Sequence, residues 1–111
     1  MPKVYVTQEV AYADYQQAER FGEVVFLCTS EVSNITGSLH NRKLLNVIRE
    51  RFREYDPDTD YIAPSGSPIV SCIVMALARE KGSVFNFLKW SNRDRQYSQV
   101  TFDLKETGHV L

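Results

Sequence analysis

Residues 60–82 have the sequence DYIAPSGSPIVSCIVMALAREKG, and this stretch decides the fold. The short apolar run at 61–63 predicts a strand, which the Pro- and Gly-containing turn at 64–67 ends. A long apolar helix is predicted to follow at once, over residues 68–81. A strand, a tight turn and a helix in this order are typical of an α/β domain.

The helix predicted over 68–81 carries almost no polar residue in its first two turns. A helix that is apolar all round is buried all round. A single chain of 111 residues with two substantial helices can hardly cover both sides of it. We therefore predict that one side of this helix packs on the sheet and the other on a partner subunit, in a homodimer or a higher homo-oligomer.

The other segments predict the rest of a single domain that spans residues 1–111. A short helix or a helical turn is predicted at 14–21, and an amphipathic helix at 41–55, where apolar residues recur at helical spacing. In the last strand Val100, Phe102 and Leu104 alternate with polar residues and are predicted to point inward. Strands are predicted at 3–8, 23–29, 61–63, 84–90 and 97–104.

The order of these elements predicts the fold class. Strands and helices alternate as far as the fourth strand, and the fifth strand follows the fourth after a short charged turn. This order predicts a three-layer α/β domain with a mostly parallel, Rossmann-like or flavodoxin-like sheet that ends in an antiparallel β-hairpin. The Ser-, Thr-, Asn- and Gly-rich segment at 30–40 has no clear periodicity, so it is the best candidate for a functional loop.

The composition restricts the classes of partner. With 13 basic and 14 acidic side chains the net charge is near −1, so the chain lacks the broad positive field that holds a nucleic-acid polymer. It has no run of about 18 apolar residues and no basic leader before an apolar one, so we expect no membrane association and a cytoplasmic location. Cys28 follows an apolar run and Cys72 precedes one, so both are predicted to be buried, reduced thiols.

A binding site is predicted at the turn after the third strand. In such sheets the ligand crevice lies beyond the carboxyl ends of the parallel strands, where the strand order reverses. If the first strand neighbours the third, that edge collects Gln8 together with Ser65, Gly66 and Ser67. The free N–H groups and the dipole of the helix start can hold a phosphate there. The same residues also suit a plain helix start, with Ser67 as the N-cap and Gly66 in the turn.

The further candidate ligand contacts are Lys89, Trp90 and Arg42. Lys89 can neutralise a phosphate and Trp90 can stack on a base at the end of the fourth strand, while Gln8 can select a base or ribose edge. The alternative is that Trp90 is a core or interface aromatic and Lys89 a solvated charge. Arg42 follows Ser38 at the start of the first long helix and can likewise meet an anion, although Ser38 also suits a plain helix cap.

The signals for catalysis are weak, and we predict no catalytic residue, no cofactor and no metal. The two histidines, His40 and His109, have no zinc-site spacing to cysteines or carboxylates. Ser65 lacks the spacing of a nucleophile elbow and an evident activating base. An enzyme would need Glu9, Glu31 or His40 as its acid or base.

Several segments resemble a family of short proteins encoded in tailed-phage genomes. The similar segments are VYVTQE, FGEVVFL, GSLHNRKLLNVIRE, SGSPIV and LKWSNRDRQY. The resemblance covers nearly the whole chain, and LKW followed by a charged turn and an aromatic residue is its most distinctive part. It implies a phage protein that acts in the cytoplasm of the host cell.

A second resemblance is one of type. Small oligomeric phage proteins with a nucleotide-sized pocket include sponges that capture signalling nucleotides, among them the anti-Thoeris Sequestin and Lockin groups, which sequester ADP-ribose-derived signals. The inferred oligomer, the helix start and the weak catalytic signals are similar to that type, and the argument is one of analogy.

The leading hypothesis is therefore a protein that sequesters a phosphorylated nucleotide signal, ADP-ribose-derived or cyclic, and so inhibits bacterial immune signalling without catalysis. One alternative is a protein-interaction module that docks a host or phage protein through the apolar helix at 68–81. Another is an enzyme that processes a nucleotide.

Overall fold

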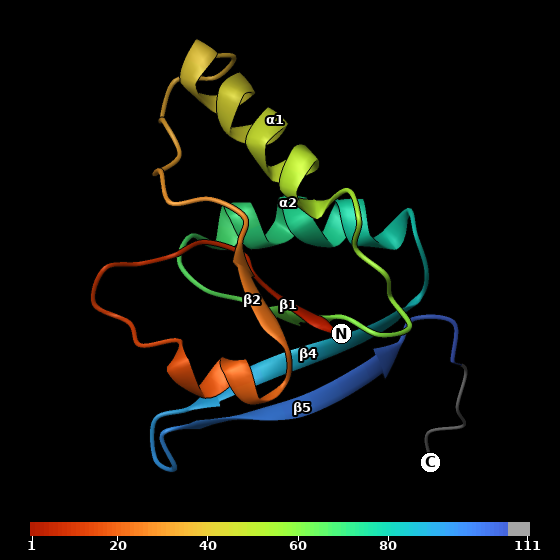
Figure 1. Ribbon diagram of the computed structural model, residues 1–111. Helices are drawn as coiled ribbons and strands as arrows, with labels where there is room; N and C mark the ends of the chain where they lie inside the picture. The colour runs from red at the N-terminus through yellow and green to blue at the C-terminus, as the bar shows by residue number, and fades with distance from the viewer. Residues whose placement is uncertain (107–111) are drawn as a thin grey trace, which may run out of the picture.

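Runs of β-branched and aromatic residues form a five-stranded sheet in the computed structural model, which describes residues 1–106 (Figure 1). The strands are β1 (Lys3–Val6), β2 (Glu23–Phe26), β3 (Tyr61–Ala63), β4 (Val84–Ser91) and β5 (Gln96–Asp103). Their order across the sheet is β2-β1-β3-β4-β5. The first four strands pair in parallel and β4 pairs with β5 antiparallel, which confirms the mostly parallel sheet, the final hairpin and the pairing of the first strand with the third.

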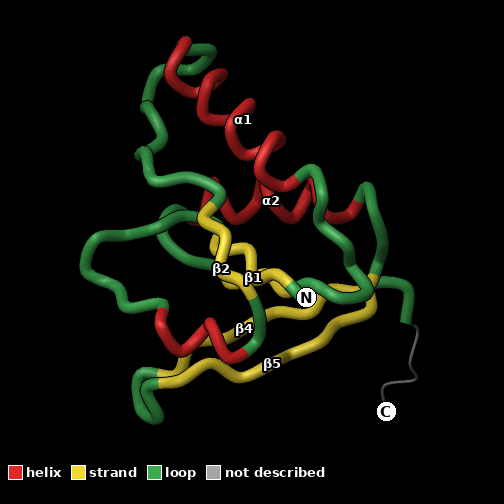
Figure 2. The backbone as a smooth tube through the Cα atoms, viewed as in Figure 1, coloured by secondary structure: helices red, strands yellow, loops and turns green. Residues whose placement is uncertain are grey.

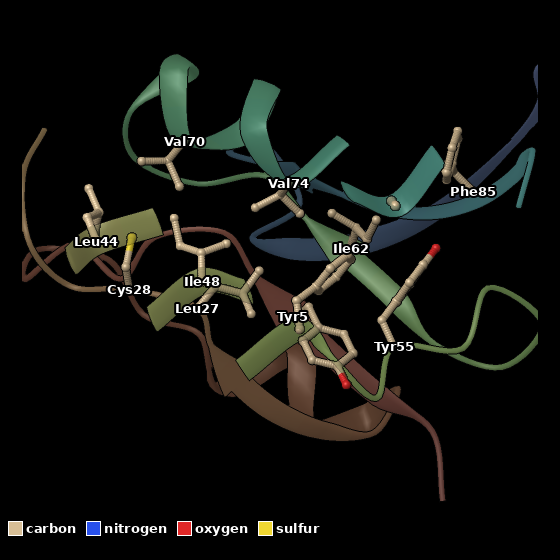
Figure 3. Packing of buried hydrophobic residues seen from close by; sticks show 12 residues of the cluster. Tyr5, Leu27, Cys28, Leu44, Ile48, Tyr55, Ile62, Val70, Val74 and Phe85 are labelled. Atoms are coloured by element: carbon tan, nitrogen blue, oxygen red, sulfur yellow. The ribbon is translucent and has the colours of Figure 1, made fainter. Parts of the chain in front are cut away.

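Both α-helices cover one face of the sheet, because each buries an apolar stripe there (Figure 1). The helices are α1 (Leu39–Phe52) and α2 (Pro68–Arg79). Ile48 of α1 and Val74 of α2 are fully buried in one core cluster with Tyr5 and Ile62 of the sheet (Figure 3). Burying side chains of this size stabilises a fold by about 1.5–3 kcal/mol each, so this cluster holds the helices to the sheet.

The opposite face of the sheet carries much less helix. Its core cluster joins Val4, Val6 and Leu88 to Ala18 of η1 (Gln16–Arg20), a 3₁₀ helix of five residues. The helix predicted at 14–21 is therefore present only as this shorter, tighter element. Within residues 1–106 the two faces are covered unequally, and the full three-layer arrangement stays a prediction.

Two predictions about burial were wrong. Phe102 and Leu104 are 57% and 59% exposed, and the Cys72 side chain on α2 is also exposed, whereas Cys28 is buried as predicted. Among the described residues, no member of β5 belongs to the core cluster under α1 and α2. The alternation of β5 therefore gives two faces, but no described helix covers the apolar one.

Side chains satisfy backbone groups at the helix ends. Ser38 caps α1 by accepting a hydrogen bond from the Asn41 N–H, and the Ser67 hydroxyl accepts one from the Ile69 N–H at the start of α2. Beyond the end of α2, the Lys81 ammonium donates to the carbonyl oxygens of residues 52, 53 and 55, at the end of α1. A cation is favourable at this negative end of a helix dipole.

Within residues 1–106, no helix has both the length and the apolar character that a membrane crossing requires.

Candidate functional site

The strand order reverses at β1, whose neighbours β2 and β3 lie on opposite sides of it. The polypeptide leaves the carboxyl ends of β1 and β3 in loops that lie where α2 begins. Figure 2 shows the loops after β1 and β2 as two long green segments on the side of the molecule where α2 begins. Open α/β sheets bind their ligands at such a point.

A hollow of about 720 Å³ lies at this edge of the sheet, and we call it the edge hollow. The loop predicted to be functional forms one wall of it, and the turn before α2 forms another. Tyr12, which is 92% exposed, is one of the residues that line it. The edge hollow is lined by Gln8, Val10, Tyr12, Glu31, Val32, Ser33, Asn34, Gly66, Ser67 and Ile69.

Gln8 clamps two walls of the edge hollow together. Its side chain is only 5% exposed, its Nε2 donates to the Ser30 carbonyl oxygen at 2.8 Å, and its Oε1 accepts from the Ser67 N–H at 2.6 Å. One of the N–H groups that the start of α2 offers is therefore already bound within the chain. The amide that the sequence suggests as a ligand contact also fixes the shape of the site.

Gly66 has a backbone conformation that favours glycine, and it lies against the Gln8 side chain. Its φ of +74° lies in the left-handed region, which glycine adopts without strain. A Cβ atom at this position would lie 2.1 Å from Oε1 of Gln8. The glycine thus permits Gln8 to approach the turn. This contact accounts for a glycine at position 66 without a bound phosphate.

Ser65 is held by buried hydroxyl groups. The Thr7 Oγ1 accepts a hydrogen bond from the Ser65 N–H and donates to the Ser65 carbonyl oxygen, both at 2.8 Å. The hydroxyls of Ser65 and Tyr15 lie 2.8 Å apart, and Thr7 Oγ1 lies 3.2 Å from the Ser71 hydroxyl. This network makes the turn rigid, and it uses polar groups that the sequence suggests for a ligand.

The other predicted contacts lie outside the edge hollow. Trp90 packs in the cluster on the η1 face, where its ring meets Tyr97 edge-on at 4.9 Å and its Nε1 donates to Asn92. Lys89 is exposed, and because it adjoins Trp90 in β4, its side chain points to the opposite face of the sheet. Arg42 lines a separate, largely apolar hollow of about 290 Å³ between α1 and α2. The structure brings Gln8, Gly66 and Ser67 together, but it does not place Lys89, Trp90 or Arg42 with them.

A second hollow, which we call the basic hollow, lies between α1 and the segment after β2. It has a volume of about 320 Å³ and is lined by Cys28, Thr29, Ser30, His40, Lys43, Leu44, Val47 and Arg51. Residues 28–30 border the basic hollow and residues 31–34 border the edge hollow, so one short segment forms a wall of each.

The charges of the basic hollow come from one stripe of α1. His40, Lys43 and Arg51 recur along the helix with Val47 between them, a spacing that puts them on one side. The ion pairs in the described part of the chain join Lys3 to Glu54 and Arg53 to Glu50, so no carboxylate of residues 1–106 forms an ion pair with Lys43 or Arg51. This helical spacing is the sequence signal that could have found the basic hollow.

Two side chains of the basic hollow are tied to the backbone. The Arg51 guanidinium donates to the Phe26 carbonyl oxygen at 3.0 Å, and the His40 Nε2 lies 2.6 Å from the Glu31 carbonyl oxygen. Burial raises the pKa of the Cys28 thiol, with the Arg51 charge acting in the opposite direction. Cys28 is therefore held as an unreactive thiol.

The three residues considered for catalysis line three different hollows, although the His40 ring contacts the Glu31 backbone. Glu31 lines the edge hollow, His40 lines the basic hollow, and the Glu9 N–H donates to the Cys28 carbonyl oxygen. Among residues 1–106, no group of three or more His, Cys, Asp or Glu side chains is placed to hold a metal ion. His109 lies outside the described residues.

Comparison with known proteins gives a family. The model of the phage Pam3 gp32-like protein family matches residues 2–104, nearly the whole chain. The chain therefore belongs to the phage Pam3 gp32-like protein family, and the resemblance to a phage protein family is confirmed. No curated protein and no solved structure matched the chain.

Proposed function

We propose that this member of the phage Pam3 gp32-like family binds a small phosphorylated nucleotide and holds it without turning it over. The ligand is an ADP-ribose-derived or cyclic nucleotide signal of bacterial immunity, captured in the cytoplasm of the host cell. The observation that carries the proposal is the position of the edge hollow at the reversal of strand order, next to the basic hollow, whose cations pair with no described carboxylate.

The strand order supports the choice of site. The order β2-β1-β3-β4-β5 is that of flavodoxin-like sheets, which bind a nucleotide between the first and third strands. We treat the Rossmann-like or flavodoxin-like architecture as part of this proposal. The edge hollow also has the size of ordinary ligand pockets, which measure about 300–1,000 Å³.

The charges support a division of the ligand between the two hollows. The residues that line the edge hollow include Glu31 and no lysine or arginine, so this hollow suits an uncharged base or ribose. Tyr12 would stack on that part of the ligand, and Ser33 and Asn34 would bind its polar edge. Phosphate groups would lie in the basic hollow against Lys43 and Arg51, since charge-assisted hydrogen bonds to phosphate are the stronger ones.

Gln8, Ser65, Gly66 and Ser67 have a different part in this proposal from the one that the sequence suggests. Their described hydrogen bonds run within the chain, so they shape the edge hollow and hold its walls at a fixed separation. Direct phosphate contact through the start of α2 stays a prediction, as do the contacts assigned to Lys89, Trp90 and Arg42.

Thermal unfolding of the protein with a panel of ligands tests the proposal. The panel contains ADP-ribose derivatives, cyclic nucleotides, an unphosphorylated nucleoside and inorganic phosphate. A phosphorylated nucleotide should raise the melting temperature more than the other two, because binding to the folded state stabilises it by mass action. Mass spectrometry of the recovered ligand should find it unchanged.

Two lysine variants locate the phosphate. Lys43→Met should weaken binding by roughly tenfold, the effect of losing about 1.4 kcal/mol of binding free energy. Lys89→Met is the matched control, since Lys89 is exposed and lines neither hollow. No shift with any nucleotide would sink the proposal, and a larger loss in Lys89→Met would return the phosphate to the position predicted from the sequence. A chemically altered ligand would mean an enzyme.

A second candidate function is protein docking through α2, and one observation favours it. The outward side of α2 is uncharged over its first turns, with Ile69 58% exposed and Cys72 and Ala76 exposed as well. Alkylation of Cys72 in the purified protein and in phage-infected cells would test it. Protection of Cys72 only in cells would favour a docked partner, and equal reactivity in both would argue against one.

A further inference from the structure

Among residues 1–106, no strand pairs with the outer edge of β5, and this edge differs from most edges of natural sheets. The strand is eight residues long, and its register with β4 continues without a bulge from Gln96 to Asp103. Its sequence, QYSQVTFD, has no lysine, arginine or proline. Natural proteins use short strands, charges, prolines and bulges to keep an exposed edge from pairing with another chain.

The outward-pointing backbone groups of β5 follow from its register. The Leu104 N–H donates to the Ser83 carbonyl oxygen, directly across the pair of strands. In an antiparallel pair such hydrogen-bonded positions alternate, so even-numbered residues of β5 bond to β4. The N–H and C=O groups of Tyr97, Gln99 and Thr101 therefore point away from the sheet.

The edge strand on the other side of the sheet is protected. β2 has four residues, and the Arg51 guanidinium of α1 donates to its Phe26 carbonyl oxygen. This side chain occupies an acceptor that another strand would need. Association through strand pairing is thus open at one edge of the sheet and obstructed at the other.

The charges at the two ends of β5 are opposite. The turn before the strand contains Arg93 and Arg95 with one aspartate, whereas the strand ends in Asp103. An antiparallel pair of two β5 strands with Gln99 opposite the partner's Gln99 would bring Asp103 beside the partner's Arg95. A parallel pair would bring like charges together.

We propose that β5 pairs antiparallel with β5 of a second copy of this chain, so that two sheets join into one across a two-fold axis. Gln99 lies opposite the partner's Gln99, and Tyr97 opposite the partner's Thr101. The contact is self-complementary, so it closes at a dimer, and the obstructed β2 edge prevents further growth. Val100 and Phe102, which no described helix covers, lie beside the seam between the subunits.

This contact differs from the α2 contact predicted from the sequence, and it does not depend on the proposed ligand. Sedimentation velocity over a range of protein concentrations measures the dimer. Gln99→Pro removes an outward N–H and leaves the bonds to β4 intact, because proline is tolerated at such positions of edge strands. It should raise the dimer dissociation constant by roughly tenfold or more. Ala76→Lys, on the outward side of α2, is the matched control and should leave it unchanged.

Further variants keep the test independent of folding. Ser98→Lys places a charge in the seam at an exposed position and should weaken the dimer as Gln99→Pro does. Asp103→Arg and Arg95→Asp should each weaken it, and the double variant should restore it. A wild-type chain that is monomeric at all concentrations would overturn the proposal. So would a dimer that these β5 variants leave intact or that only Ala76→Lys disrupts.

Discussion

Two groups of buried polar side chains in this protein differ in how their hydrogen bonds are satisfied. At the carboxyl edge of the sheet, Thr7 and Gln8 are almost completely buried, and their polar atoms bond to the turn before α2 and, through Gln8 Nε2, to the Ser30 carbonyl oxygen. In the core under the helices, the hydroxyls of Tyr5 and Tyr55 are buried and have no hydrogen-bond partner among the described residues (Figure 3). The first group fixes a geometry, whereas the second is a by-product of aromatic packing.

The contrast has a physical reason. Tyr5 and Tyr55 pack with Phe52, with ring centroids 4.4–5.8 Å apart. The rings contribute apolar area, edge-on contacts of Tyr5 with both other rings, and a stacked contact between Phe52 and Tyr55. The hydroxyls lose their water in the process, and burial raises the pKa of each phenol to about 12, with the Asp60 carboxylate adding to the effect. The same chemical group is thus stabilising at one position and costly at another.

The largest effect is expected from Gly66→Ala, which breaks the satisfied group. The new Cβ would displace Gln8 Oε1 and strain a left-handed backbone, so we expect a loss of about 2–4 kcal/mol of unfolding free energy in urea titrations. Gly37→Ala is the matched control, because Gly37 has nearly the same φ, +72°, but nothing within 4 Å of its Cβ position. Gly37→Ala should lower the unfolding free energy by about 1 kcal/mol.

A double variant separates the displacement of Gln8 from the strain of the left-handed backbone. In a Gln8→Ala background the Cβ that Gly66→Ala introduces has less to displace, so the added cost of this second substitution should fall toward that of Gly37→Ala. Equal costs at Gly66 and Gly37 in the wild-type background would show that the clamp by Gln8 contributes nothing.

A smaller loss is expected from Thr7→Val, which removes a hydroxyl and keeps the shape of the side chain. The Ser65 N–H and the Ser71 hydroxyl lose their partner at a buried position, so the unfolding free energy should fall by about 1–3 kcal/mol. Ser98→Ala, at an exposed position of β5, is the control for removal of a hydroxyl and should change it by about 0.5 kcal/mol or less. An unchanged stability in Thr7→Val would remove the distinction between the two groups.

The smallest effect, and one of opposite sign, is expected from Tyr5→Phe and Tyr55→Phe. Each removes a buried hydroxyl that has no partner among the described residues, so the unfolding free energy at neutral pH should stay unchanged or rise by about 1 kcal/mol. A loss comparable to that of Thr7→Val would mean that these hydroxyls are bonded in solution.

The pH dependence of stability checks the same pair of variants. The pKa of each phenol is raised from its ordinary value of 10.0 to about 12 in the folded chain, so the unfolded chain releases these protons first. Wild-type stability should therefore be constant with respect to these groups below pH 10 and fall as the pH rises from 10 to about 12. In the double Phe variant this part of the alkaline loss should be absent.

The fold was predictable from the sequence to a considerable extent, and the site less so. The turn at residues 64–67 and the apolar runs around it predict the parallel pairing and the start of α2 at Pro68, since both depend on local patterns. The hydroxyl of Tyr15 on Ser65 and the clamp of Gln8 were not predictable, because they join residues far apart in the chain. For the same reason the sequence suggested these polar groups as free for a ligand.

The sequence by itself determined the order of the strands and helices along the chain and the membership of a phage protein family. The order of the elements follows from periodicity and from turn residues, which act over a few neighbours along the chain. The family membership follows from the match over residues 2–104. Only the tertiary structure decided that Trp90 packs in the cluster on the η1 face, that the cations of α1 gather at the basic hollow, and that no described helix covers Phe102. Those properties depend on which elements lie against which, and packing between distant segments fixes them.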